Sequence, residues 1–109
     1  MASADPRLRQ LKIKTGVLKR CAKEKVMYEK EADEIAAKIE RMKADNKNEY
    51  DIRKQNEVLA ESKMMIPDCK KRIEAAYRDL ESLIEECKTD FAEMEELELA
   101  VEQLKQVTI

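Results

Sequence analysis

The chain has 109 residues, enough for one domain, and 42% of them are charged, with a formal net charge of −2. One glycine, three tyrosines, one phenylalanine and no tryptophan argue against folds built from sheets and tight turns. No run approaches the ~18 consecutive apolar residues of a membrane-spanning helix. The composition is instead typical of long, packed helices.

The first predicted helix covers about residues 5–44. Asp5 is a good N-cap, and Pro6 occupies the favoured first position. Gly16 lies inside this helix, which we explain by the close approach of another helix. One stripe advances in steps of three or four residues, as expected for a buried helix face: Leu8, Leu11, Lys14, Leu18, Cys21, Lys25, Tyr28, Ala32, Ile35, Ile39 and Met42.

A turn follows, in which Asn46 can adopt a left-handed conformation and Asn48 can cap the next helix. That second helix covers about 48–87. Pro67 falls inside it and predicts a kink, because an interior proline removes a backbone hydrogen bond at a cost of ~3 kcal/mol. Either the bend is useful or Pro67 helps to present a surface. The stripe keeps its phase across the proline: Ile52, Gln55, Leu59, Ser62, Ile66, Cys69, Ile73, Ala76, Leu80, Leu83 and Cys87.

The third predicted helix covers about 90–106 after a turn at Thr89 and Asp90. Asp90 and Glu93 have the spacing of a capping box. The expected buried stripe is Phe91, Met94, Leu97, Val101 and Leu104.

The three stripes fit together in one register. If consecutive helices are antiparallel, the same second-helix residues face both neighbours and form the layers Leu8–Leu83–Met94, Leu11–Leu80–Leu97 and Leu18–Ile73–Leu104. We therefore predict one all-α domain over 1–109. It is an elongated, antiparallel three-helix bundle of the spectrin-like kind, with left-handed coiled-coil packing and a shorter third helix. That helix would cover only residues 5–25 and 69–87, which leaves a two-helix extension near Asn46.

Charge is unevenly distributed along the chain. Residues 1–25 hold eight basic and two acidic side chains, a balance of +6, and residues 81–109 hold nine acidic and two basic ones, a balance of −7. In the predicted bundle the two segments lie side by side and neutralise each other. This weakens the alternative in which the basic segment binds nucleic acid or lipid.

The side chains needed for common catalytic and metal sites are scarce. The chain has no histidine, and its single glycine cannot form a phosphate-binding loop. Cys21, Cys69 and Cys87 lack metal-ligand spacing and lie on helical stripes, so we interpret them as reduced core residues. We expect no enzyme activity, catalytic residue, cofactor or metal.

The segment before Pro67 is more apolar than one helix seam requires. Val58, Met64, Met65 and Ile66 lie there, and Met27 and Tyr28 would lie opposite them. Methionine adapts to irregular partner surfaces. Two interpretations remain open: these side chains form a partner-binding surface, or they fill a loose hairpin core.

Several segments closely resemble the tubulin-specific chaperone A family, also called tubulin-folding cofactor A. They are LKIKTGVLKR (11–20), KEKVMYEKEA (23–32), YDIRKQ (50–55) and ESKMMIPDC with RIEAAY (61–77). The resemblance extends over most of residues 5–80 in one register. The third helix resembles the family only in being short, acidic and amphipathic.

The resemblance implies a cofactor that binds β-tubulin folding intermediates after the cytosolic chaperonin and supports α/β-tubulin heterodimer assembly. Other tubulin-folding cofactors would be indirect partners. We expect a monomer that binds neither nucleic acid nor membrane, in the cytoplasm and associated with the cytoskeleton. The expected partner-binding residues are motif positions and flanking lysines: Lys25, Tyr28, Lys63, Met64, Met65, Ile66, Pro67, Asp68 and Lys70.

Two other functions are considered. The chain could be a coiled-coil oligomerisation or adaptor module, although Lys14 and Lys25 on the stripe would weaken self-association. Alternatively, the basic segment from Arg7 to Lys25 could form an amphipathic arm for membranes, nucleic acid or calmodulin-like partners. A dimer that forms with rising concentration in sedimentation would support the first alternative. Salt-sensitive binding to acidic lipid or DNA would support the second.

Overall fold

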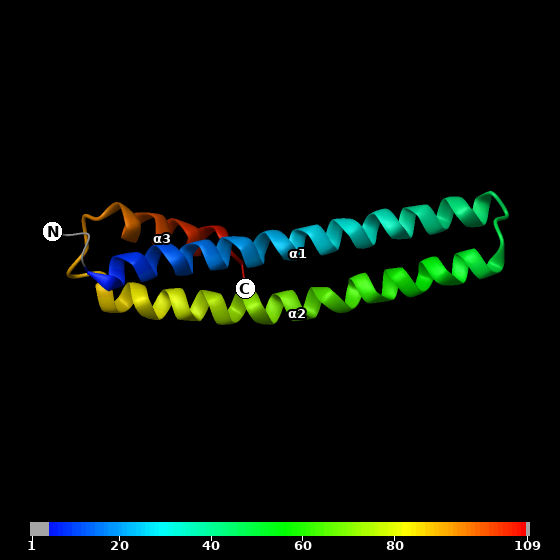
Figure 1. Cartoon of the computed structure of the whole chain (residues 1–109). Helices are drawn as coiled ribbons and strands as arrows, with labels where there is room; N and C mark the ends of the chain where they lie inside the picture. Colours follow the sequence, from blue (N-terminus) through cyan, green and yellow to red (C-terminus); the bar gives the residue numbers. More distant parts are fainter. Residues whose placement is uncertain (1–4, 109) are drawn as a thin grey trace. The chain divides into compact units, whose positions relative to one another are not determined.

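The computed structural model describes residues 5–108, which form three helices (Figure 1). They are α1 (Pro6–Ala44), α2 (Glu49–Cys87) and α3 (Glu95–Gln106). The all-α prediction, with two long helices and a shorter third, is confirmed. The predicted bounds of the first two helices differ from the observed ones by one residue at their starts.

Both predicted caps and the left-handed turn are present. The Asp5 Oδ1 atom accepts a 2.9 Å hydrogen bond from the backbone N–H of Arg7. Asn48 Oδ1 likewise accepts a 2.7 Å bond from the backbone N–H of Tyr50. These oxygens satisfy amides that a helix start leaves without partners. Asn46 between the helices has φ 54°, a conformation that asparagine tolerates well.

The chain forms two compact units. Unit 1 combines residues 5–22 with residues 71–108 and contains all of α3. Its core is a cluster of buried side chains from all three helices, in which Leu11, Leu18 and Leu80 are fully buried. Every residue of the three predicted layers belongs to this cluster or packs against it.

Unit 2 is the continuous segment 23–70, a hairpin made by the end of α1 and the start of α2. Its buried residues are Ala32, Ile39, Ser62 and Cys69. Most other stripe residues of this unit are only half-buried. Two helices cannot enclose both flanks of their seam, so apolar side chains next to it stay in contact with water.

The predicted start of the third helix is wrong. Residues 88–93 form turns, and α3 begins only at Glu95 after Met94, which makes no side-chain capping bond. The predicted capping box fails because the Asp90 carboxylate binds Arg7 instead. The buried residues of α3 are Leu97, Ala100 and Gln103, and Phe91, Met94 and Leu104 of the predicted stripe pack against the same core.

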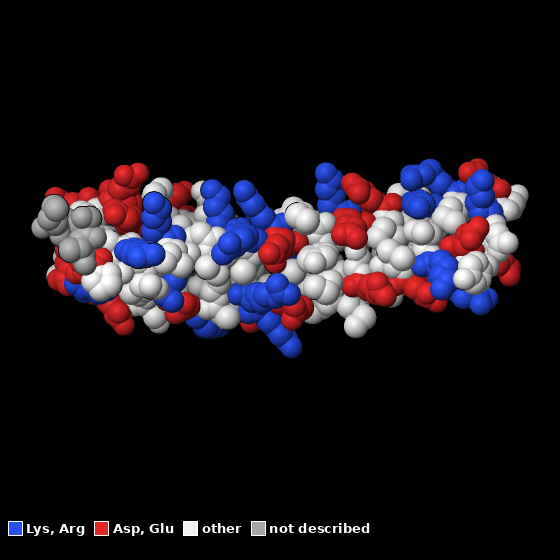
Figure 2. All heavy atoms as spheres, viewed as in Figure 1, with Lys and Arg blue, Asp and Glu red and all other residues white. Residues whose placement is uncertain are grey.

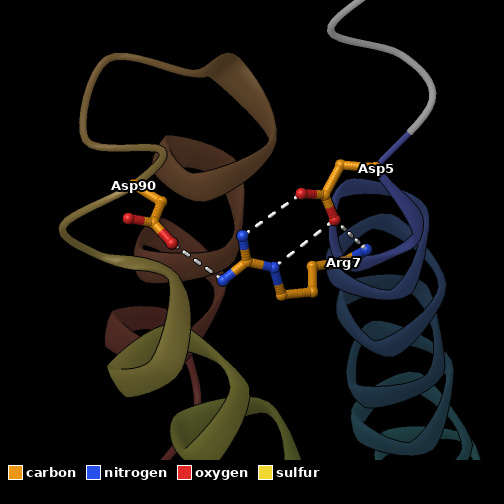
Figure 3. Close-up of polar contacts among 3 residues, drawn as sticks. All are labelled: Asp5, Arg7 and Asp90. Atoms are coloured by element: carbon orange, nitrogen blue, oxygen red, sulfur yellow. Dashed lines mark hydrogen bonds and ion pairs between the residues drawn. The ribbon is translucent and has the colours of Figure 1, made fainter.

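Arg7 ties the turn after α2 to the start of α1 within unit 1 (Figure 3). Its Nη1 lies 2.9 Å from Asp90 Oδ2, and its Nη2 lies 3.1 Å from Asp5 Oδ2. The guanidinium also stacks 4.7 Å from the ring centroid of Phe91. Hydrogen bonds from Arg7 lower the pKa of Asp5, and those from Asp5 and Asp90 raise the pKa of Arg7.

Gly16 does not mark a close helix contact. A Cβ atom added there would meet nothing within 4 Å, and the glycine has no positive φ. The predicted close approach is therefore wrong. At Pro67, in contrast, α2 continues without interruption. The kink, the left-handed packing and the single-domain organisation stay predictions.

The three cysteines are free thiols, with Cys69 and Cys87 buried and Cys21 half-buried. Burial raises the pKa of the Cys87 thiol, since a thiolate would lose its hydration there. Between residues 5 and 108, no helix has the length and apolar character needed to cross a membrane.

Candidate functional site

Unit 2 contains an open hollow of about 410 Å³ between α1 and α2, which we call the methionine hollow. The two helices contribute to it at positions that the predicted antiparallel register places opposite each other. Its lining consists of Tyr28, Glu31, Val58, Glu61, Ser62, Met64 and Met65. The hollow brings together three of the predicted site residues, Tyr28, Met64 and Met65.

The apolar side chains of this region are well exposed. Met64 is 72% exposed and Val58 41%, while Met65 and Tyr28 are half-buried. Met27 is 64% exposed and lies four residues before Glu31, so it is on the same flank of α1 as the hollow. Of the two open interpretations, this exposure favours a partner-binding surface, because a Met64 side chain that filled the hairpin core would be buried.

The charged side chains of the methionine hollow are both acidic. Glu31 comes from α1 and Glu61 from α2, and no lysine or arginine is among the described residues that line it. On the face shown in Figure 2, uncharged surface follows the seam between α1 and α2 in unit 2, with charged side chains of both signs along it. Neither glutamate was among the predicted site residues, although their helical spacing from Tyr28 and Met65 could have indicated them.

The other predicted site residues do not line the hollow. Lys63, Pro67 and Lys70 are exposed, and steps of four and three place them on the flank of α2 opposite to Glu61 and Met65. The predicted basic border is therefore absent from the methionine hollow. Its place is taken by glutamates, since residues two apart on a helix point to different sides.

The remaining three predicted residues occupy separate positions. The Lys25 Nζ atom lies 3.3 Å from Glu29 Oε2 on its own helix, where the lysine side chain is 27% exposed. Ile66 is half-buried on the stripe, and Asp68 is exposed. None of these three lines the hollow.

The arrangement is suited to holding apolar side chains of another molecule. Within residues 5–108 no group of three or more histidine, cysteine, aspartate or glutamate side chains could hold a metal ion. An open, methionine-lined surface can repack around partners of irregular shape. Fold and site together define a helical binding protein.

Comparisons with known proteins agree with this class. A family model described as Tubulin binding cofactor A matches residues 6–104. The chain is 61% identical over 93 residues to the human protein named tubulin-specific chaperone A, covering 85% of each chain. The solved structure of human tubulin chaperone cofactor A matches with a TM-score of 0.79 and 53% identity, over 95% of this chain and 100% of that one. Tubulin folding cofactor A from Arabidopsis thaliana matches with a TM-score of 0.84 and 44% identity, over 93% and 94% of the two chains.

The chain belongs to the tubulin binding cofactor A family. This membership confirms the resemblance found in the sequence. It also confirms the prediction of a binding protein rather than an enzyme.

Proposed function

We propose that this chain is a tubulin-folding cofactor that binds β-tubulin folding intermediates released by the cytosolic chaperonin and supports assembly of the α/β-tubulin heterodimer. Family membership supports tubulin as the partner. The observation that supports the proposed binding site is the exposed methionine hollow of unit 2. We further propose that the protein acts as a cytoplasmic, cytoskeleton-associated monomer, which sedimentation at micromolar concentration tests.

The proposed mechanism is physical rather than chemical. An incompletely assembled tubulin subunit exposes apolar surface that would otherwise aggregate. Covering part of that surface with Met64, Met65 and Tyr28 lowers the free energy of the bound intermediate relative to aggregates. Other folding cofactors would then receive the subunit, so their contact with this chain is indirect. The lysine flank around Pro67 (Lys63 and Lys70), together with Lys25, would face acidic parts of the same partner.

The double substitution Met64→Ser and Met65→Ser tests this proposal. It removes apolar contact area while leaving the fully buried residues untouched, so we expect binding of β-tubulin to weaken about tenfold, or ~1.4 kcal/mol. Circular dichroism should show unchanged helicity. The measurement is the amount of β-tubulin, free of α-tubulin, that the immobilised protein retains from cell extract.

A matched control replaces two exposed apolar residues of unit 1, Ile13→Ser and Leu99→Ser, which are 46% and 55% exposed. This control should retain β-tubulin as the wild type does. If the methionine variant melts early and still binds in proportion to its folded fraction, the methionines belong to the core and the proposed surface is wrong. If the wild type retains no β-tubulin, the proposed function fails.

A further inference from the structure

The methionine hollow continues into a second hollow along the same seam of unit 2. This second hollow, of about 550 Å³, shares Glu31 and Val58 with the first and extends towards the turn as far as Arg41. Together they form one groove, here named the seam groove. From Tyr28 to Arg41 it follows thirteen residue steps of α1, or roughly 20 Å at 1.5 Å per residue.

The charges of the seam groove are arranged by sign. Glu31, Glu34 and Glu61 lie along its first part, and Lys38 and Arg41 lie nearest the turn. Glu31 and Arg41 are ten residues apart on one helix, or about 15 Å. The groove is therefore acidic beside the methionines and basic at its other end.

Three of these charged side chains form no ion pair within the described part of the chain. Neighbouring exposed glutamates do form ion pairs: Glu29 with Lys25, and Glu57 with Lys54. Within residues 5–108, Glu31, Glu61 and Arg41 take part in no such pair. A partner that covers the apolar floor also removes water from the glutamates, which costs free energy unless the partner supplies cations.

We propose that the seam groove binds one amphipathic helix of the tubulin partner in a single orientation. Apolar side chains of that helix enter the methionine hollow, a lysine or arginine beside them pairs with Glu31 and Glu61, and an acidic residue pairs with Lys38 and Arg41. A helix satisfies its own backbone hydrogen bonds and presents side chains at the spacing that a seam between two helices accepts. This inference rests on the proposed function and names the chemistry of the segment recognised.

Charge reversal of the two glutamates tests the inference. The variant Glu31→Lys with Glu61→Lys should bind β-tubulin at least about tenfold more weakly, because like charges would then meet in a desolvated groove. The matched control Asp33→Lys with Glu74→Lys makes the same change in net charge at exposed positions outside the groove. It should bind within about twofold of the wild type. Thermal melting of every variant shows whether it is folded.

A milder pair of substitutions is less prone to cause misfolding. Glu31→Gln with Glu61→Gln keeps the side-chain shape and should still weaken binding, by about three- to tenfold. A photo-cross-linking residue at Met64 then identifies the bound segment in the wild-type background. We expect the cross-linked tubulin peptide to come from a helix with lysine or arginine next to apolar residues.

The possible outcomes separate this inference from the proposed function. If the wild type binds β-tubulin while the reversed variant binds as tightly as its control, the groove assignment is overturned and the function stands. Equal losses in variant and control would mean a general charge effect, and an acidic cross-linked peptide would contradict the proposed chemistry. Failure of the wild type to bind β-tubulin overturns both.

Discussion

At the scale of single residues, Gly16 makes α1 less stable than alanine at the same position would. It lies in the interior of α1, exposed, with open space where a side chain would be. Glycine loses more backbone entropy on folding than alanine, and its negative φ here creates no special need for it.

Gly16→Ala should therefore stabilise the protein by ~1 kcal/mol. The measurement is the midpoint of urea unfolding at an unchanged slope, which reports stability rather than a change in exposed surface. A destabilising result would contradict the open space around this position. Retention of β-tubulin should stay at the wild-type level, since Gly16 is remote in sequence from the residues that line the seam groove.

The ion pair between Arg7 and Asp5 contributes stability that depends on pH through the Asp5 carboxyl group. Because the folded state lowers the pKa of Asp5, this carboxylate contributes stability at all pH values above its ordinary value, near 3.8. The contribution disappears as the pH falls through the lowered folded-state value. The side chains are partly exposed, so the effect is screened by salt.

At the scale of elements, Pro67 is the least expected feature of α2. The helix passes through it without interruption, although proline cannot donate a backbone hydrogen bond and crowds the preceding turn. The proline ring is exposed and lies on the lysine flank rather than in the seam groove.

Pro67→Ala should raise the free energy of unfolding by about 2 kcal/mol. Restoring a helix-forming residue gains ~3 kcal/mol, and the greater freedom of the unfolded chain offsets up to ~1 kcal/mol of this. Thermal unfolding measures the change. If the variant is more stable and retains β-tubulin as the wild type does, the proline is not needed for binding. Weaker binding by the more stable variant would instead indicate that the predicted kink or the lysine flank takes part.

The helices differ in how well their sequences indicate them. For α1 and α2, stripes of eleven residues with strict spacing indicate bounds and buried faces, because each extra turn repeats the same signal. The start of α3 was missed because Asp90 and Glu93 satisfy a short local pattern, whereas the distant Arg7 determines where the carboxylate goes. Tertiary contacts of this kind leave no trace in local spacing.

The residues of the candidate site could also be predicted only in part from the sequence. The apolar content before Pro67 led to the prediction of Met64 and Met65, since excess apolar residues are visible in composition, and both residues line the methionine hollow. The expected basic border was placed by nearness in sequence, but neighbouring residues on a helix point about 100° apart. Lys63 therefore lies on a different side from Met65, and Glu31 reaches the hollow from another helix.

At the scale of the whole molecule, the two units should differ in local stability. Unit 1 has a core built from three helices, whereas unit 2 has two helices and a few buried residues, among them the polar Ser62. Helices packed on fewer apolar contacts open more often.

Hydrogen exchange should reveal this difference. We expect amides of α1 and α2 in residues 23–70 to exchange about ten times faster, or more, than those of the same helices in unit 1. Bound β-tubulin should slow exchange in residues 28–41 and 55–65, which line the seam groove. Uniform exchange along both helices would show that they open as one cooperative element.

The division of unit 1 between distant parts of the chain has a consequence for synthesis. Residues 23–70 can pair as soon as they leave the ribosome, because the Asn46 turn brings consecutive segments together. Leu11 and Leu18 emerge earlier, yet they cannot be buried until their packing partners, Leu80 and then α3, have been synthesised. At translation rates of 5–20 residues per second this delay lasts roughly 3–20 s. The cationic side chains of the nascent 5–22 segment would repel those of other nascent chains during that interval, so this charge opposes aggregation before the core of unit 1 forms.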